Sequence, residues 1–271
     1  MNVLSVEEIK QYQMEMLEYL DRVCRENSLT YSLSFGSLLG AIRHQGYIPW
    51  DDDVDIILPY YDYVKLLELL KKDGKYDVAI PGETKNYWLC YSKILHKDTY
   101  TLFEYAYKTW GKGGVFIDIF PMSYYSSDKK EREKHIARML RYEKRMLVSY
   151  EKGLMAFRKT NGTLKSLVRI PYVIFCKVMG GGYWHKRIQK KMQTPEDIGE
   201  YIGWFAIGAK KIWSKEAVKE TGARKFEGLE LQCFKNYDYI LTTLYKDYMR
   251  LPPESERVFP HNKEKMYRYE R

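Results

Sequence analysis

Residues 36–56 decide the fold, and they read Gly-Ser-Leu-Leu-Gly-Ala-Ile-Arg-His-Gln-Gly-Tyr-Ile-Pro-Trp-Asp-Asp-Asp-Val-Asp-Ile. The stretch follows an alternating run, Tyr31 to Phe35, that has the pattern of a short strand. Ser37 to His44 then has the pattern of a brief helix, and Val54 to Leu58 is apolar enough to be a buried strand. This order of strand, helix, turn and strand predicts an α/β fold in which the acidic residues lie at the edge of a sheet.

The stretch ends in a cluster of four carboxylates, Asp51, Asp52, Asp53 and Asp55. Like charges this close raise one another's pKa values and destabilise the fold unless a cation compensates them. The chain as a whole has a net charge of +9, so general acidity does not explain the cluster. If strand geometry extends back to Asp51, then Asp51, Asp53 and Asp55 point one way and Asp52 points the other. Oxygen ligands without His or Cys favour Mg²⁺ or Mn²⁺.

A further acid, Asp118, is flanked by apolar residues in the strand-like run Phe116 to Phe120. Burying a carboxylate without a partner is costly, and a second metal-facing strand would explain its position. Asp118 could also accept a proton from an attacking hydroxyl. The competing structural interpretation of the whole acidic cluster is a solvated turn or a calcium loop. An EF-hand is excluded, because the 12-residue spacing that it requires is missing.

Gly36 and Ser37 are candidates for binding a phosphate, because a glycine at a strand end lets backbone N–H groups approach an anion. Arg43 could clamp a phosphate with two hydrogen bonds, or it could be an ordinary surface arginine. Trp50 could stack on a base, or it could simply anchor the turn before the acids. A catalytic role for His44 is the less favoured of its two interpretations.

Size and composition indicate a soluble globular protein of 271 residues with 45% hydrophobic content, which excludes a disordered chain. The four cysteines (24, 90, 176 and 233) are scattered and form no zinc pattern, so free buried thiols in a reducing compartment are expected. The N-terminus lacks the pattern of a signal peptide, and the sequence has no run of about 20 apolar residues. We therefore expect a cytoplasmic location.

The positive charge is concentrated in the middle of the chain, where residues 129–191 contain 18 Lys and Arg against four Glu. This section has helical patterns, and it divides a mildly acidic remainder. We predict one catalytic domain over residues 1–271, with a core of 1–125 and 200–271 and a basic helical insertion of 126–199. The asymmetry suggests a polyanionic partner, such as an anionic membrane face, although solvated helix faces explain it about equally well.

The signature from Gly36 to Ile56 resembles that of the LicD family, bacterial phosphotransferases related to fukutin in the nucleotidyltransferase superfamily. The run Leu251-Pro252-Pro253, and the residues near Phe226 and Tyr245, are similar as well. Lys246 departs from the family, whose members commonly have Gly at that position. The resemblance implies a nucleotidyltransferase-like mixed sheet of the α+β type that carries the helical insertion.

The resemblance also implies an activity: moving phosphocholine, or a related phospho-alcohol, from a CDP-linked donor such as CDP-choline to a sugar hydroxyl of teichoic acid, capsule or lipopolysaccharide. The superfamily's Asp-x-Asp pair corresponds to Asp53 and Asp55, its third acid corresponds to Asp118, and Asp51 could assist. The implied acceptor is a glycan or lipid-linked glycan, and nucleic acid is not an expected partner. For the basic helices we favour docking at the inner membrane face, where Leu164 to Met179 could lie in the interface, although a packed core helix is the slightly favoured interpretation of that segment.

A choline group would need an aromatic cage. The candidate residues are Tyr87, Trp88, Tyr91, Tyr105, Tyr107 and Trp110. Two other functions remain open at this point. One is a nucleotidyltransferase that transfers a nucleoside monophosphate to a small acceptor, and the other is a non-enzymatic protein that binds polyanions. Release of CMP or of pyrophosphate would separate the two enzymes.

Overall fold

The computed structural model describes residues 2–101, 113–151, 163–206, 209–257 and 265–269. The helices are α1 (Val6–Glu26), α2 (Phe35–Arg43), α3 (Tyr60–Asp73), α4 (Lys129–Tyr150), α6 (Thr163–Met179), α7 (Gly181–Met192), α8 (Lys215–Val218) and α9 (Tyr237–Tyr245), with 3₁₀ turns η1 (Glu196–Ile198) and η2 (Glu254–Glu256). The strands are β1 (Asn2–Val3), β2 (Ser32–Leu33), β3 (Asp55–Pro59), β4 (Asp77–Ala79), β5 (Ser92–Leu95), β6 (Thr99–Thr101), β7 (Phe116–Tyr125), β8 (Tyr201–Ala206), β9 (Ala209–Ser214), β10 (Thr221–Phe226), β11 (Leu229–Phe234) and β12 (Met266–Arg268).

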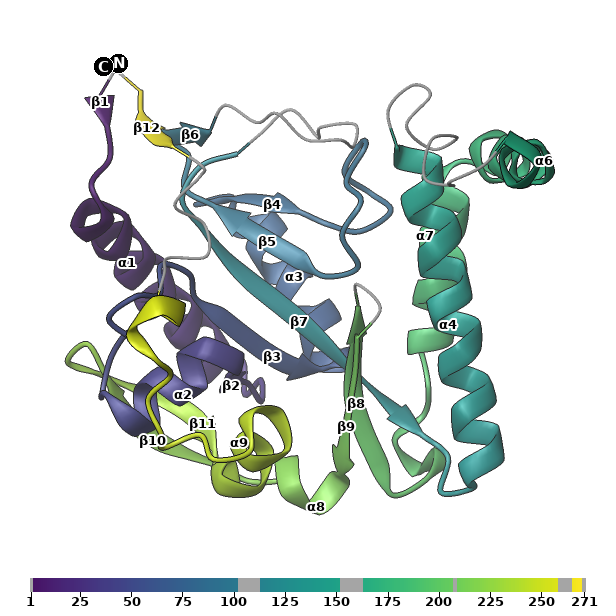
Figure 1. The fold of residues 1–271 in the computed structure, drawn as a ribbon. Helices are drawn as coiled ribbons and strands as arrows, with labels where there is room; N and C mark the ends of the chain where they lie inside the picture. The colour runs from purple at the N-terminus through teal and green to yellow at the C-terminus, as the bar shows by residue number, and fades with distance from the viewer. Residues whose placement is uncertain (1, 102–112, 152–162, 207–208, 258–264, 270–271) are drawn as a thin grey trace.

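The main sheet is mixed, which confirms the predicted fold class (Figure 1). Its strand order is β2-β3-β7-β5-β4, and β8 and β9 continue it from the far end of β7. Strands β3 and β7 are parallel, whereas the other pairs are antiparallel. Strand β7 is buried along all ten residues. It therefore forms the centre of the sheet, and it pairs with β3, which carries Asp55, and with β5.

Strand β7 continues through Pro121, although the sequence predicted that the proline would end it. On one edge, β7 pairs with β5 up to Ile119 and with β8 from Ser123 onward. The N–H of Asp118 points to the other edge, toward β3. Successive N–H groups of a strand point to opposite edges, so the N–H that Pro121 lacks would point to the edge of β5 and β8. Neither β5 nor β8 pairs with residue 121, so the proline costs no hydrogen bond between strands.

Other predicted boundaries were also wrong by a few residues. Helix α2 begins at Phe35 and includes Gly36, so this glycine does not end a strand. Strand β3 begins only at Asp55, because Asp51 N–H donates to Ile48 carbonyl and closes a turn at 2.9 Å. Strand β5 covers Ser92–Leu95, and α9 ends at Tyr245.

Helices cover the two faces of the sheet differently. On α3, the Tyr63 hydroxyl lies 2.6 Å from that of Ser92 on β5. Ser92 precedes Lys93 in the strand and therefore points to the opposite face, so α3 packs on the face away from Lys93. Helices α4 and α7 lie side by side at the edge of the sheet, with α6 across one end of them (Figure 1). No helix among the described residues has an apolar stretch long enough to cross a bilayer.

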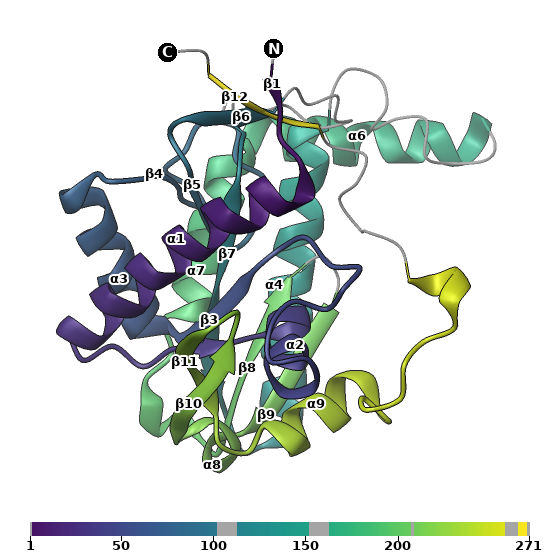
Figure 2. The ribbon, with the colours of Figure 1, turned by 90° about the vertical axis from the view of Figure 1, so that its left-hand side faces the viewer.

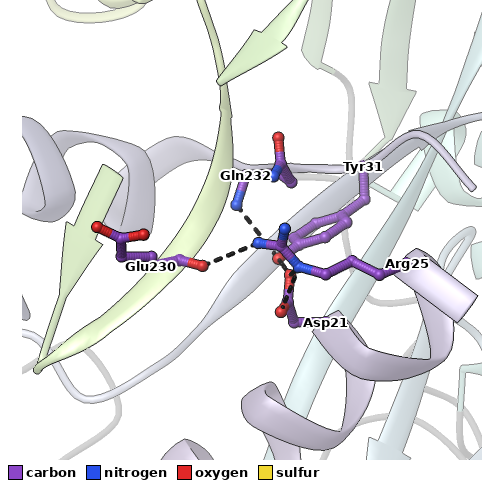
Figure 3. A network of polar contacts seen from close by, with 5 residues as sticks. All are labelled: Asp21, Arg25, Tyr31, Glu230 and Gln232. Atoms are coloured by element: carbon purple, nitrogen blue, oxygen red, sulfur yellow. Dashed lines mark hydrogen bonds and ion pairs between the residues drawn. The ribbon is translucent and has the colours of Figure 1, made fainter. Parts of the chain in front are cut away.

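The hairpin β10–β11 and α9 lie beside α2 (Figure 2). A polar network anchors the hairpin to α1 (Figure 3). Arg25 on α1 pairs with Asp21 at 2.7 Å and donates to the Glu230 carbonyl of β11 at 2.9 Å. The hydroxyl of Tyr31 donates to Asp21 and accepts the N–H of Gln232. The network therefore joins α1, near the start of the chain, to β11, near its end, and β11 also packs beside β2.

A further sequence prediction is confirmed, because all four cysteines are free and buried. At the start of α1, Ser5 and Glu8 form a capping box with reciprocal hydrogen bonds of 2.8 and 3.2 Å. The short strands β1 and β12 pair with each other, so the first and last described segments lie together. The predicted division into a core and an insertion stays a prediction, although described residues between β7 and β8 form α4, α6, α7 and η1.

Candidate active site

Three charged side chains form a row across adjacent strands on one face of the main sheet. Asp55 on β3 is directly opposite Asp118 on β7, and Lys93 on β5 is directly opposite Asp118 on the other side. The exposed fractions of these residues are 8%, 5% and 8%. The Lys93 Nζ atom lies 2.5 Å from Asp118 Oδ1. The sequence therefore correctly placed two acids on neighbouring strands, but the lysine beside them was missed.

Lys93 neutralises part of the charge in the row. Its ammonium group lies 3.5 Å from the centre of the Phe116 ring, so it is enclosed by an aromatic face as well as by Asp118. Burial raises the pKa of Asp55 well above its usual value, as do the charges of Asp53 and Asp118, whereas Lys93 lowers it. A lysine inside the largely apolar stretch of residues 87–95 was the sequence signal that could have identified it.

Asp51 and Asp53 lie in the irregular segment before β3 rather than in a strand, so the condition on which their predicted strand register depended is not met. This segment nevertheless brings Asp51 and Asp53 together. Burial raises the pKa of Asp51 to about 7, and the charge of Asp53 and a hydrogen bond to it contribute in the same direction. The backbone of Asp52 is anchored to α1, because its carbonyl accepts a 2.9 Å hydrogen bond from the Gln13 side chain.

Gly36 and Ser37 support the acids directly. A Cβ atom on Gly36 would come within 2.5 Å of Asp51 Oδ2, so only glycine allows the helix to approach this carboxylate. The Ser37 hydroxyl accepts the N–H of Asp55 at 2.9 Å and is 3% exposed. Gly36 and Ser37 therefore help to position Asp51 and Asp55. The predicted contact of Gly36 and Ser37 with a donor phosphate stays a prediction.

Arg43, at the end of α2, holds the segment after α9. Its guanidinium donates to the carbonyls of Tyr248 and Arg250 at 2.8 and 3.4 Å, and its Nε donates to the ring of His44 at 2.9 Å. These contacts form one wall of a cavity of about 600 Å³. The cavity lining includes Arg43, Trp50, Tyr245, Asp247, Arg250 and Arg257. Arg43 and Trp50 were thus predicted as site residues, whereas the other four were missed.

The loop that leads to the acids is fixed by Glu227, which lies in the tight turn between β10 and β11. Its carboxylate accepts the N–H of Tyr47 at 2.9 Å, and a Cβ on Gly46 would collide with it. Arg224, on β10, lies 5.2 Å from the ring of Tyr237. The hairpin thereby sets the position of residues 46–50, although it is more than 170 residues away in sequence.

The predicted choline-binding aromatics are only partly brought together. Tyr87 is fully buried, and its carbonyl bonds the ring of His185, so it belongs to the core. Trp88 is half-buried. Tyr91 faces Phe120 with ring centres 4.2 Å apart, close to the acids. Tyr105, Tyr107 and Trp110 lie outside the described residues.

Two rings that the sequence did not indicate complete a cluster with Tyr91 and Phe120. Phe35 lies 5.1 Å from Phe120, and Trp204 lies 4.9 Å from Phe35 and 5.3 Å from Phe120. These rings come from α2, β7, β8 and the segment before β5, which explains why spacing along the chain gave no sign of them.

The donor chemistry of the site suits a hard divalent cation. Asp51, Asp53 and Asp55 repel one another, and Asp118 repels Asp55, which a bound cation would relieve. Within the described ranges, however, no three His, Cys, Asp or Glu side chains surround one point. Mg²⁺ usually takes one or two protein carboxylates and completes its shell with water and substrate phosphates. A pair such as Asp53 and Asp55 therefore meets the requirement.

Comparison with known proteins gives one match to a family and several to individual proteins. Residues 28–158 match the family described as LicD/FKTN/FKRP, nucleotidyltransferase domain. The chain is 27% identical to the lipopolysaccharide cholinephosphotransferase LicD of Haemophilus influenzae, over 98% of this chain and 99% of that protein. An uncharacterized protein of Rickettsia prowazekii is 34% identical over 35% of this chain and 41% of its own length.

Proposed function

The chain belongs to the LicD family, and from this premise we propose that it is a phosphotransferase that moves phosphocholine, or a related phospho-alcohol, to a sugar hydroxyl of a cell-surface glycan. The proposed donor is CDP-choline or another CDP-alcohol, and lipopolysaccharide is the first acceptor to test. The observation that carries the proposal is the similarity to a cholinephosphotransferase along nearly the whole of both chains. The row of Asp55, Asp118 and Lys93 supports it, because phosphoryl transfer needs charge placed on a rigid scaffold.

The acids would hold Mg²⁺ or Mn²⁺ through Asp53 and Asp55, with Asp51 and Asp118 beside them. A bound ion would neutralise charge on the donor pyrophosphate during transfer. In the reaction, the acceptor oxygen forms a bond to the phosphorus that carries the alcohol, and the bond from this phosphorus to CMP breaks. Asp118 takes the proton of the acceptor hydroxyl, and Lys93 holds its carboxylate in place at 2.5 Å.

The test is to incubate the protein with Mg²⁺, an acceptor glycan and a panel of CDP-alcohols, and to measure CMP and pyrophosphate separately. CMP released with CDP-choline supports the proposal. Pyrophosphate released from CTP with a small acceptor would instead support the nucleotidyltransferase alternative. Asp53→Asn and Asp55→Asn should abolish CMP release, whereas Asp52→Asn is the matched control and should retain it.

A membrane contact is the second part of the proposal. On α6, the apolar side chains Ile174, Phe175 and Val178 are 50%, 45% and 77% exposed. They lie within the section of the sequence that carries an excess of Lys and Arg. Apolar side chains within a basic section suit the surface of an anionic bilayer, where a lipid-linked acceptor would be reached.

Liposome flotation tests this contact with vesicles of neutral lipid and with vesicles that contain anionic lipid. We expect binding to the anionic vesicles, and a marked decrease in that binding when Val178 and Phe175 are replaced by Ser. Tyr61→Ser, on the distant helix α3, is the control for loss of an exposed apolar group. Absence of binding to both kinds of vesicle would remove the membrane from the proposal without affecting the transfer reaction.

A further inference from the structure

Helix α2 connects two binding surfaces of different chemistry. Its first residue, Phe35, belongs to the aromatic cluster with Tyr91, Phe120 and Trp204, and its last residue, Arg43, lines the 600 Å³ cavity. At 1.5 Å per residue, the two ends of the helix are about 12 Å apart. Between them, Gly36 packs on the carboxylate of Asp51. A molecule lying along α2 would therefore meet the aromatic cluster, the acids and the cavity in that order.

The cavity at the far end carries a net positive charge. Three arginines line it, Arg43, Arg250 and Arg257, against one acid, Asp247. The Arg257 guanidinium lies 5.2 Å from the centre of the Trp50 ring, and its Nε donates to the Pro252 carbonyl at 2.9 Å. Arginine on tryptophan beside a ring-sized space suits a nucleobase and its phosphate. The volume is also in the range of small-molecule pockets.

The wall of the cavity includes two residues that link it to the acids. Trp50, in its wall, directly precedes Asp51 in the chain. Tyr245, which also lines the cavity, has its pKa raised by burial and then by the charges of Asp55, Asp51 and Asp53. The Tyr245 hydroxyl therefore lies within the electrostatic range of the acidic cluster. A nucleotide in the cavity can extend its phosphates past this ring to the aspartates.

The same charges exclude a quaternary ammonium group from the cavity. Three guanidinium groups repel a trimethylammonium group, which cannot lose its charge, and one carboxylate does not balance them. The aromatic cluster has the opposite character. Its four rings carry no charge, and the Lys93 ammonium group, which lies 5.7 Å from the centre of the Tyr91 ring, is paired with Asp118. Faces of aromatic rings attract quaternary ammonium groups, most strongly when tryptophan is among them.

The cluster is also accessible and held in position. Phe35 and Trp204 are half-buried, whereas Tyr91 and Phe120 are buried. Phe35 has a backbone φ of 45°, a left-handed conformation that a bulky residue seldom adopts. Such strain is retained where packing fixes it, and here it directs the ring toward Phe120 and Trp204. The Lys93 ammonium group, which pairs with Asp118, lies 5.7 Å from the centre of the Tyr91 ring, so this ring lies beside the charged row.

We infer that the donor lies along α2, with its nucleotide in the cavity of Arg43 and Arg257 and its trimethylammonium group on the aromatic rings of Phe35 and Trp204. The phosphates then lie at the aspartates between the two ends. This orientation rests on the proposed function, because it assumes a donor with an anionic nucleotide end and a cationic alcohol end. It assigns the cationic end to Tyr91, Phe120, Phe35 and Trp204 and leaves Tyr87 in the core.

Isothermal titration of the two donor fragments, CMP and phosphocholine, tests the orientation in the full chain. Trp204→Leu and Phe35→Leu should each weaken phosphocholine binding roughly 5- to 30-fold and leave CMP binding within about twofold. Arg257→Gln should weaken CMP binding about 10-fold and leave phosphocholine unchanged. Tyr61→Leu and Arg22→Gln remove an exposed ring and an exposed guanidinium elsewhere, and neither should change the affinity for either fragment.

Circular dichroism of each variant ensures that a loss of affinity is not a loss of folding, and Trp204→Phe, which keeps a ring, should retain most phosphocholine binding. The orientation is overturned if the aromatic variants weaken CMP and Arg257→Gln weakens phosphocholine, or if the wild-type protein does not bind phosphocholine. In that last case, continued release of CMP from CDP-choline would show that the proposed reaction stands and that only the placement of the donor is wrong.

Discussion

The buried ion pair between Lys93 and Asp118 gives the sharpest test of the site's electrostatics. In Lys93→Met the side chain keeps nearly the same length but loses its charge, so Asp118 remains buried opposite Asp55 without its ammonium partner. Both side chains of the pair are about nine-tenths buried, with exposed fractions of 10% and 8%. Removing one partner of such a pair costs about 3–5 kcal/mol. That is a large part of the 5–15 kcal/mol typical of a whole domain.

The assay is unfolding in urea at pH 7 with EDTA present, followed by tryptophan fluorescence. Lys93→Met should lower the free energy of unfolding by about 3–5 kcal/mol. The double variant Lys93→Met with Asp118→Asn removes both charges of the ion pair, and it should recover most of this loss. The matched control is Lys235→Met, whose partner Glu220 lies 2.7 Å away but whose side chains are 60% and 65% exposed. It should cost less than about 1 kcal/mol.

Two results would refute the reasoning. One is a loss below about 1.5 kcal/mol for Lys93→Met, which would mean that water or a rearranged partner solvates Asp118. The other is a double variant as unstable as the single one, which would mean that the lysine stabilises through its contact with Phe116 rather than through its charge.

Three further predictions concern the surroundings of the acids. Gly36→Ala should reduce CMP release at least about 10-fold and destabilise the fold by about 1–3 kcal/mol, because the new Cβ would lie 2.5 Å from Asp51 Oδ2. The control is Gly182→Ala, whose Cβ would meet no neighbouring atom, and activity and melting temperature are measured for both variants. The Asp51 pKa of about 7 exceeds its unfolded value, so its proton stabilises the fold at low pH, and unfolding free energy measured in EDTA should fall between pH 4 and 7. Asp51→Asn should flatten that profile, and an unchanged slope would contradict the assignment. Lys246→Gly should raise the melting temperature, because Lys246 has a φ of 61°, which glycine adopts without strain. A lower melting temperature would show that the lysine's own contacts outweigh about 1 kcal/mol of backbone strain.

Local sequence determined the elements around the site well. The alternating and helical patterns between residues 31 and 58 predicted the order of strand, helix and strand, because these patterns reflect which side chains a short segment can bury. Boundaries were less accurate where a longer-range partner decides them. Strand β7 passes through Pro121 only because its neighbour on that edge changes from β5 to β8.

For the site, the sequence by itself identified the acids, since four carboxylates in five positions and an aspartate in an apolar run are costly unless they have a function. Only the tertiary structure placed Lys93 against Asp118, gathered four rings from separate elements beside them, and formed an arginine-lined cavity from α2 and the segment after α9. The reason is physical: a charge anomaly is visible in one segment, whereas a partner, an aromatic surface or a cavity exists only when segments distant in the chain pack together. The acids of residues 51–55 could be identified from the sequence. Their neutralising lysine depends on the register of β5 against β7, and the arginine-lined cavity depends on the packing of α9 against α2.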